Sequence, residues 1–179
     1  MLKKILIAFA IVILVLVVVA ALQPSDFRVV RTAAISAPPE AVFAQVNDFH
    51  NWDSWSPWAK LDPAMKQGYE GSPSGKGAVY AWTGNHSVGE GRMTLTESRP
   101  AELVRIDLDF VKPFKGHNKT EFTFRPEGKQ TTVTWSMEGQ KNFISKAIGL
   151  FMSMDRMIGR NFEQGLIQLK TVVETSVKK

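Results

Sequence analysis

The sequence predicts an α+β fold, in which a curved antiparallel sheet wraps around one long C-terminal helix and a single N-terminal transmembrane helix precedes the sheet. Three patterns carry this prediction. Residues 5–22 are continuously apolar, apolar and polar residues alternate between residues 78 and 139, and apolar residues recur at three- and four-residue steps from Ile144 to Val173. A break after the apolar run divides the chain into an N-terminal anchor, residues 1–24, and one folded domain, residues 25–179.

The N-terminal apolar run has the length of a membrane span. Its eighteen residues carry no charged or polar side chain, and at 1.5 Å per residue they form a helix about 27 Å long, close to the ~30 Å hydrocarbon core of a bilayer. Lys3 and Lys4 precede the run, which places the N-terminus in the cytoplasm. We therefore expect a single-pass protein of the cytoplasmic membrane with its domain on the extracytoplasmic side, although Arg28 and Arg31 reduce the charge asymmetry.

Two other interpretations of the run stay open. It could be a signal peptide, cleaved after Ala20 or Ala21, where small residues occur. The apolar part of a signal peptide typically has about 7–15 residues, so this run is long for one. The run could also be a buried core helix.

The elements of the domain follow in a simple order. Residues 27–36 read as a first strand, Pro39 suits the first turn of a helix, and residues 41–47 continue that short helix. Short turns then join five expected strands, which imply an antiparallel meander with one solvated and one buried face. These strands are expected at residues 78–83, 88–98, 102–111, 118–125 and 130–139.

The last element is a long amphipathic helix with a break near Met152. Its apolar stripe must be buried, and the dry face of the sheet is the one partner large enough. The residues expected in this stripe are Ile144, Ile148, Phe151, Met154, Ile158, Phe162, Leu166, Leu169 and Val173.

A curved sheet closed by a helix can leave a gap that side chains do not fill, and ligand pockets of this kind are mostly apolar. The residues that alternate toward the dry face are rich in aromatic and methionine side chains, which suit an irregular space. The predicted ligand-binding cavity is lined by Trp55, Tyr80, Trp82, Met93, Leu95, Ile106, Leu108, Phe110, Phe122, Trp135, Met137, Met154, Ile158 and Phe162.

Three tryptophans occur at three-residue steps between residues 51 and 63, namely Trp52, Trp55 and Trp58. In a helical or 3₁₀ turn they would share a face until Pro57 interrupts it. We interpret them first as a packed plug between the short helices and the sheet, and second as rings that contribute to the cavity wall. Asp53 and His50 are then local structure rather than catalytic groups.

Composition excludes several kinds of chemistry. The chain has no cysteine, so disulfides, thiolate nucleophiles and Cys-ligated metals are absent, and its net charge of +5 is too dispersed for a nucleic-acid surface. None of its three histidines has a partner at metal-ligand spacing, and no phosphate-binding loop or nucleophile elbow occurs. We expect no metal and no cofactor. The candidates for acid–base catalysis are Glu97, which counting by twos places on the dry face, and His86.

Several local strings, together with this order of elements, resemble the SRPBCC or START-like superfamily of helix-grip proteins, the polyketide cyclase/dehydrase and lipid-transport group. The likeness covers residues 27–174 and is greatest to membrane-anchored bacterial members. The matching strings are residues 37–43, 52–58, 75–77, 93–100, 133–135 and 161–170. The resemblance implies the helix-grip fold, but this superfamily contains lipid carriers, hormone receptors and aromatic cyclases, so it implies no single activity.

Three functions are compatible with these observations. The favoured one is a membrane-anchored, non-catalytic binder of a hydrophobic small molecule or lipid, attached to the membrane through residues 5–22, with no nucleic-acid partner and protein partners unknown. The first alternative is a cyclase/dehydrase-like enzyme acting on an aromatic or polyketide-type substrate. The second is an envelope interaction module without a ligand, for which the sequence offers no motif.

Overall fold

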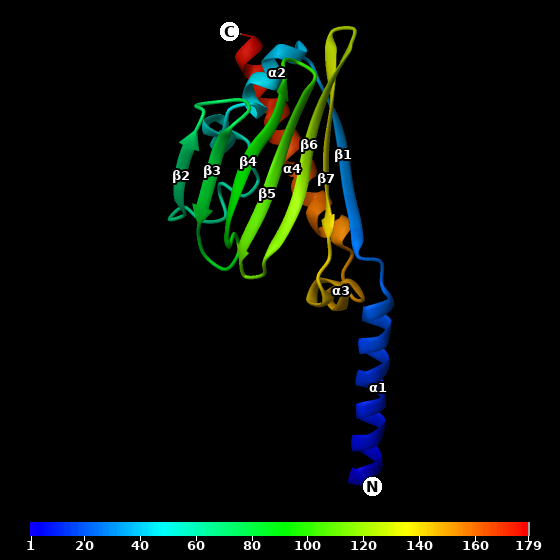
Figure 1. Ribbon diagram of the computed structural model, residues 1–179. Coiled ribbons are helices and arrows are strands. Elements are labelled where there is room, and N and C mark those ends of the chain that lie inside the picture. The colour runs from blue at the N-terminus through cyan, green and yellow to red at the C-terminus, as the bar shows by residue number, and fades with distance from the viewer. Residues whose placement is uncertain (179) are drawn as a thin grey trace.

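The computed structural model describes residues 1–178. A long apolar helix, α1 (Leu2–Leu22), projects from one end of the domain (Figure 1). The domain itself consists of β1 (Asp26–Ile35), α2 (Pro39–Val46), the 3₁₀ helix η1 (Phe49–Ser54), β2 (Lys66–Gly71), β3 (Ala78–Thr83), β4 (Glu90–Arg99), β5 (Leu103–Lys112), β6 (Gly116–Glu127), β7 (Gln130–Gln140), α3 (Phe143–Gly149) and α4 (Met154–Val177).

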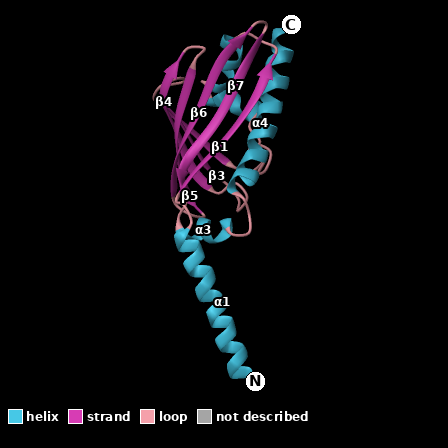
Figure 2. Ribbon diagram, turned by 90° about the vertical axis from the view of Figure 1, so that its right-hand side faces the viewer, coloured by secondary structure: helices cyan, strands magenta, loops and turns pink. Residues whose placement is uncertain are grey.

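The seven strands form one antiparallel sheet in the order β1-β7-β6-β5-β4-β3-β2. Six of them follow one another as a meander, while β1 returns to the edge beside β7 because the register Val29–Met137 places their apolar residues on the same face. The helix α4 lies along that face, as Figure 2 shows. The predicted fold class, a curved sheet closed by a C-terminal helix, is therefore confirmed: the domain has the helix-grip fold.

One apolar stripe of α4 packs against the inner face of the sheet. Phe162, Leu166, Leu169 and Val173 are buried at three- and four-residue steps. The helix begins at Ser153, whose hydroxyl oxygen accepts a hydrogen bond from the backbone N–H of Arg156. Because α4 starts at this cap, it is separate from α3, and the break that the sequence predicts near Met152 lies between the two helices.

The predicted burial of Ile144, Ile148 and Phe151 against the sheet is wrong. The chain turns at residues 150–153, so α3 leaves the line of α4 and packs beside the C-terminal end of α1 (Figure 1). The three side chains are exposed, and Phe151 retains 78% of its accessible surface. The apolar period of α4 thus continues through α3 in the sequence, but α4 packs against the sheet whereas α3 packs beside α1.

The tryptophan segment forms a plug at one side of the sheet. Trp52 donates its Nε1–H to the carbonyl oxygen of Val46 at 3.0 Å, and Trp55 donates to that of Gln45 at 3.3 Å. Both rings are buried and pack edge-on against Phe122. The indole hydrogen bonds thus fix η1 to the end of α2.

Candidate functional site

A pocket of about 360 Å³ lies between α4, the inner face of β3–β7 and residues 52–65. Its lining includes residues 87–88, 114–116, 140–142 and 145, which places it toward the end of the domain nearest to α1 and α3. Figure 1 shows that β5 and β7 end there and that β4, β6 and α4 begin there. This volume falls in the range of about 300–1,000 Å³ that is typical of small-molecule sites. The helix-grip arrangement therefore leaves an unfilled space at this end.

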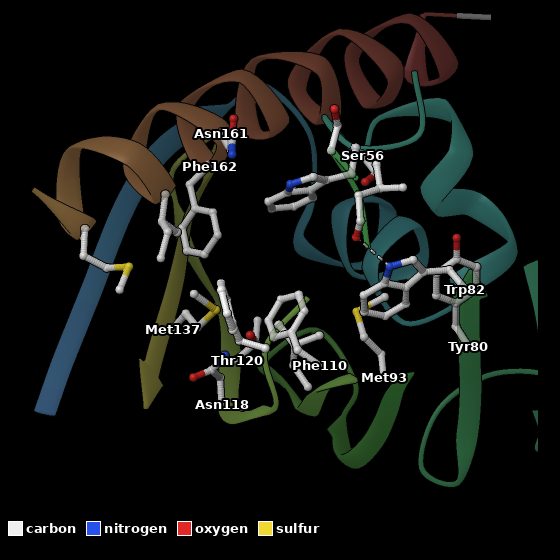
Figure 3. A pocket seen from close by; sticks show the side chains of 18 of the residues that line it. Ser56, Tyr80, Trp82, Met93, Phe110, Asn118, Thr120, Met137, Asn161 and Phe162 are labelled. Carbon is white, nitrogen blue, oxygen red and sulfur yellow. Dashed lines mark hydrogen bonds between the residues drawn. The ribbon is translucent and has the colours of Figure 1, made fainter. Parts of the chain in front are cut away.

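The walls of the pocket are mainly apolar (Figure 3). Trp82 is fixed there because its Nε1–H donates to the carbonyl oxygen of Val88 at 3.0 Å and its ring lies on Gly91, where an added Cβ atom would be 2.5 Å from Cη2. Ten of the residues predicted to line a cavity do line this pocket: Tyr80, Trp82, Met93, Leu108, Phe110, Trp135, Met137, Met154, Ile158 and Phe162.

The other four predicted residues do not line it. Trp55, Leu95, Ile106 and Phe122 are each at most 1% exposed and lie in the packed core. The three strand residues point inward as expected, but they belong to the packed core, where Trp52 and Trp55 of the tryptophan plug pack edge-on against Phe122. Residues of the core and of the pocket therefore both point inward. They differ in whether the opposing side chains fill the space in front of them.

Polar side chains that sequence reasoning missed also line the pocket. Asn118 and Thr120 of β6 point into it, and Ser56 lies across from them (Figure 3); all three are buried. Asn118 and Thr120 precede Phe122 and Phe124 at two-residue steps, so the same alternation could have found them. The amide of Asn118 lies over Gly139 of β7, in the space that a Cβ atom there would take.

Trp135 provides a further polar group. Its ring is 2% exposed and stacks on Phe162, with centroids 4.0 Å apart and planes 8° from parallel. Among the described residues, its Nε1–H has no hydrogen-bond partner. An unsatisfied buried donor costs about 1–3 kcal/mol, and this nitrogen is enclosed by the surrounding protein.

Neither catalytic candidate lines the pocket. Glu97 lies on the outer face, where its carboxylate contacts Arg105 at 2.5 Å and Arg99 at 3.4 Å. The expected inward orientation of Glu97 is wrong because β4 has a bulge between Leu95 and Glu97, which reverses the alternation. His86 is exposed in the turn between β3 and β4.

Four ionisable residues line the pocket, namely Asp53, Tyr80, Lys115 and Lys141. Tyr80 faces it, and burial raises the pKa of its phenol, with smaller contributions from Tyr69 and Asp53. Its hydroxyl group is therefore protonated at neutral pH. Asp53 lies at the exposed rim, where its carboxylate accepts a hydrogen bond from Gln67 Nε2 at 3.1 Å. Within residues 1–178, no three His, Cys, Asp or Glu side chains gather as metal ligands would.

The domain is similar in structure to several solved proteins. These include protein CV1439 from Chromobacterium violaceum (21% identity, TM-score 0.60, 85% of this chain and 99% of that chain) and protein MLL2253 from Mesorhizobium loti (16%, 0.60, 83% and 98%). DynU16, a protein of the dynemicin biosynthetic locus, is also similar (15% identity, TM-score 0.58, 83% of this chain and 48% of that chain). At these identities the likeness shows the fold alone.

No curated protein matches the chain. Residues 26–174, nearly the whole domain, match the family described as polyketide cyclase / dehydrase and lipid transport. The match begins at the first residue of β1 and ends within α4, so it covers the sheet, the pocket and the helix that closes it. The chain belongs to the polyketide cyclase/dehydrase and lipid transport family.

Proposed function

We propose that this protein is a membrane-anchored, non-catalytic binder of a hydrophobic small molecule or lipid, which it holds in the pocket beneath α4. The observation that carries the proposal is the pocket itself, about 360 Å³ of mainly apolar space in a fold whose family binds ligands. Burial of an apolar ligand there is favourable in proportion to the area removed from water.

The arrangement of polar groups supports a ligand with one polar end. Asn118 and Thr120 lie together on β6, and Trp135 lies on the neighbouring strand β7, where its Nε1–H has no hydrogen-bond partner within residues 1–178. A few placed donors in an apolar pocket fix the orientation of a ligand. A lipid or fatty acyl compound with its chain among Met93, Leu108 and Met137 suits this lining.

The helix α1 supports membrane anchoring. It is long and apolar enough to cross a bilayer, and apart from Ala20 its side chains are largely exposed. Such a surface is unfavourable in water and favourable in lipid. We propose further that this segment is retained in the mature protein, that it spans the cytoplasmic membrane, and that the domain lies on the extracytoplasmic side.

Mass spectrometry of compounds extracted from the purified full-length chain tests the proposal. Leu108→Trp fills the pocket, whereas Thr123→Trp adds the same ring to the outer face of β6 and serves as the control. We expect one class of hydrophobic compound to accompany the wild type and T123W at near-equal amounts and to be lost from L108W. Lipid that co-purifies with α1 is expected in equal amounts from all three proteins, so it does not affect the comparison. Equal recovery from L108W and T123W contradicts the proposal.

A cyclase/dehydrase-type enzyme is the second candidate, and one observation favours it. Asp53 and Tyr80 both line the pocket and could supply a base and an acid. Turnover of an aromatic or polyketide-type substrate that is lost in both Asp53→Asn and Tyr80→Phe would replace the non-catalytic assignment.

A further inference from the structure

The end of the domain that carries the pocket also carries an exposed apolar surface. This surface, the foot patch, comprises residues of α3, of the 150–153 turn, of the start of α4 and of the β5–β6 turn, with exposed fractions between 44% and 78%. Its members are Phe114, Phe143, Ile144, Ile148, Phe151, Met152 and Met157. A cluster of exposed apolar side chains on a folded domain marks a surface that contacts a partner or a membrane.

We propose that the foot patch lies in the interface of the bilayer that α1 spans, so that the pocket opens onto the membrane. This inference rests on the membrane anchoring in the proposed function and extends it from α1 to the folded domain. The occupant of the patch is the headgroup and upper acyl region of a bilayer containing anionic lipid.

The position of α3 relative to α1 carries the proposal. Leu22 ends the apolar span, and Ser25 follows three residues later, which is a reach of about 10 Å at most. The carbonyl oxygen of Ser25 accepts a hydrogen bond from the backbone N–H of Lys141 at 2.7 Å, and Asp26 accepts one from Gln140 Nε2 at 3.0 Å. The linker therefore holds the start of the α3 segment within about 10 Å of the end of the span, at or just beyond the headgroup layer, which is about 5–7 Å thick on each side.

Direct packing supports the same placement. The helices α1 and α3 lie in contact (Figure 1), and Ala20, in the last turn of α1, is buried while its neighbours are exposed. A helix of apolar residues held at the level where a span leaves the hydrocarbon can bury its apolar side chains in the boundary between headgroups and acyl chains.

The charges around the foot patch fit anionic headgroups. Residues 141–157 contain Lys141, Lys146 and Arg156, and their one acidic residue, Asp155, is paired with Arg31. Lys115 lies on the β5–β6 turn beside Phe114. Lysines at the edge of an apolar surface extend their ammonium groups to the phosphate layer. A second copy of the chain is a poorer fit, because this copy would have to occupy the layer that the headgroups fill.

The mouth of the pocket belongs to the same surface. Lys141, Asn142 and Ser145 come from the α3 segment and line one side of the pocket, while Phe114 and Lys115 line another. When the foot patch lies in the interface, a lipid or hydrophobic molecule moves between the bilayer and the pocket without crossing bulk water. This placement accounts for why the pocket lies at the end near α1.

The test uses the full-length chain in vesicles of phosphatidylcholine and phosphatidylglycerol. The chain has no cysteine, so a single cysteine labelled with an environment-sensitive fluorophore reports one position. Phe151→Cys reports the foot patch, Leu14→Cys reports the span, and Ile167→Cys, exposed on α4 away from α1, is the matched domain control. Vesicles with and without nitroxide-labelled lipid measure quenching.

We expect nitroxide lipid to quench the labels at positions 151 and 14 to a similar extent and to leave position 167 unchanged. Quenching at 14 but not at 151 overturns the inference and leaves the anchor intact. A label at 151 that is shielded from water yet unquenched by lipid also overturns it, because the patch then faces protein. Absence of quenching at 14 overturns the anchor as well. Ligand recovery from the wild type and L108W decides the binding function separately.

Discussion

Gly165 of α4 lies directly against the indole ring of Trp135 on β7. A Cβ atom at this position would be 2.8 Å from Cζ3 of Trp135 and 3.1 Å from Cδ of Pro57. The missing side chain allows the helix, the tryptophan plug and the sheet to meet at one point. This contact sets how closely α4 approaches the sheet, and therefore where the packed core ends and the pocket begins.

Gly165→Ala should destabilise the domain. Alanine is favoured over glycine in a helix by about 1 kcal/mol, but overpacking against two rigid rings costs about 1–3 kcal/mol. We expect a net loss in the free energy of unfolding, measured by urea titration of tryptophan fluorescence. Gly149→Ala is the control because no atom lies within 4 Å of its added Cβ. Equal stability of the two variants would contradict the close contact.

Trp135→Phe should weaken ligand binding. Phenylalanine retains an aromatic ring beside Phe162 but has no N–H donor, and one hydrogen bond contributes about 0.5–1.5 kcal/mol, or roughly 2- to 10-fold in affinity. Affinity for the ligand recovered from the pocket is the measurement. Trp82→Phe is the matched control, because its Nε1–H already donates to Val88 inside the protein. A greater loss of affinity in W82F would show that Trp135 is not the polar contact.

The ion pair between β1 and α4 should give a defined pH dependence of stability. Arg31 donates to Asp155 at 2.9 Å, and this hydrogen bond lowers the pKa of the Asp155 carboxyl. A carboxyl whose pKa is lower in the folded state stabilises the protein above its unfolded pKa, about 3.9, and this contribution is lost as pH falls through the folded value.

Asp155→Asn should therefore lower the free energy of unfolding modestly at neutral pH, with the difference from wild type shrinking below about pH 4. The effect is small because Asp155 is 58% exposed and solvent screens the pair. Urea titrations across this pH range measure it. Glu127→Gln, at the exposed end of β6, controls for loss of one surface carboxylate. A difference that grows as pH falls would refute the assignment.

Glu97→Gln should leave ligand binding unchanged. Glu97 lies on the outer face with Arg105 and Arg99, so its substitution alters only an exposed ion-pair group. The amount of ligand recovered from E97Q, compared with wild type and L108W, is the measurement. Loss of ligand in E97Q would mean that the β4 bulge does not hold in solution.

The sequence by itself determined the architecture. The apolar run of α1, the two-residue period of β3–β7 and the 3.6-residue period of α4 each reflect a local geometric repeat, so the fold class and most of the element order follow from them. The edge strand β2 (Lys66–Gly71) was not predicted, because its residues are mostly exposed and show no apolar alternation. The direction of most side chains also follows, and ten predicted cavity residues line the pocket for this reason.

Only the tertiary structure decided where the pocket lies and which residues are absent from it. Phe122 and Trp135 are both aromatic residues at inward positions of alternating strands, yet only Trp135 lines the pocket, because the separation of helix and sheet depends on contacts such as Gly165–Trp135. The β4 bulge reversed Glu97, and the turn at residues 150–153 moved Phe151 from the sheet to the foot patch. Periodicity reports which face a side chain takes, but the distance to the opposing surface is set by residues far apart in the chain.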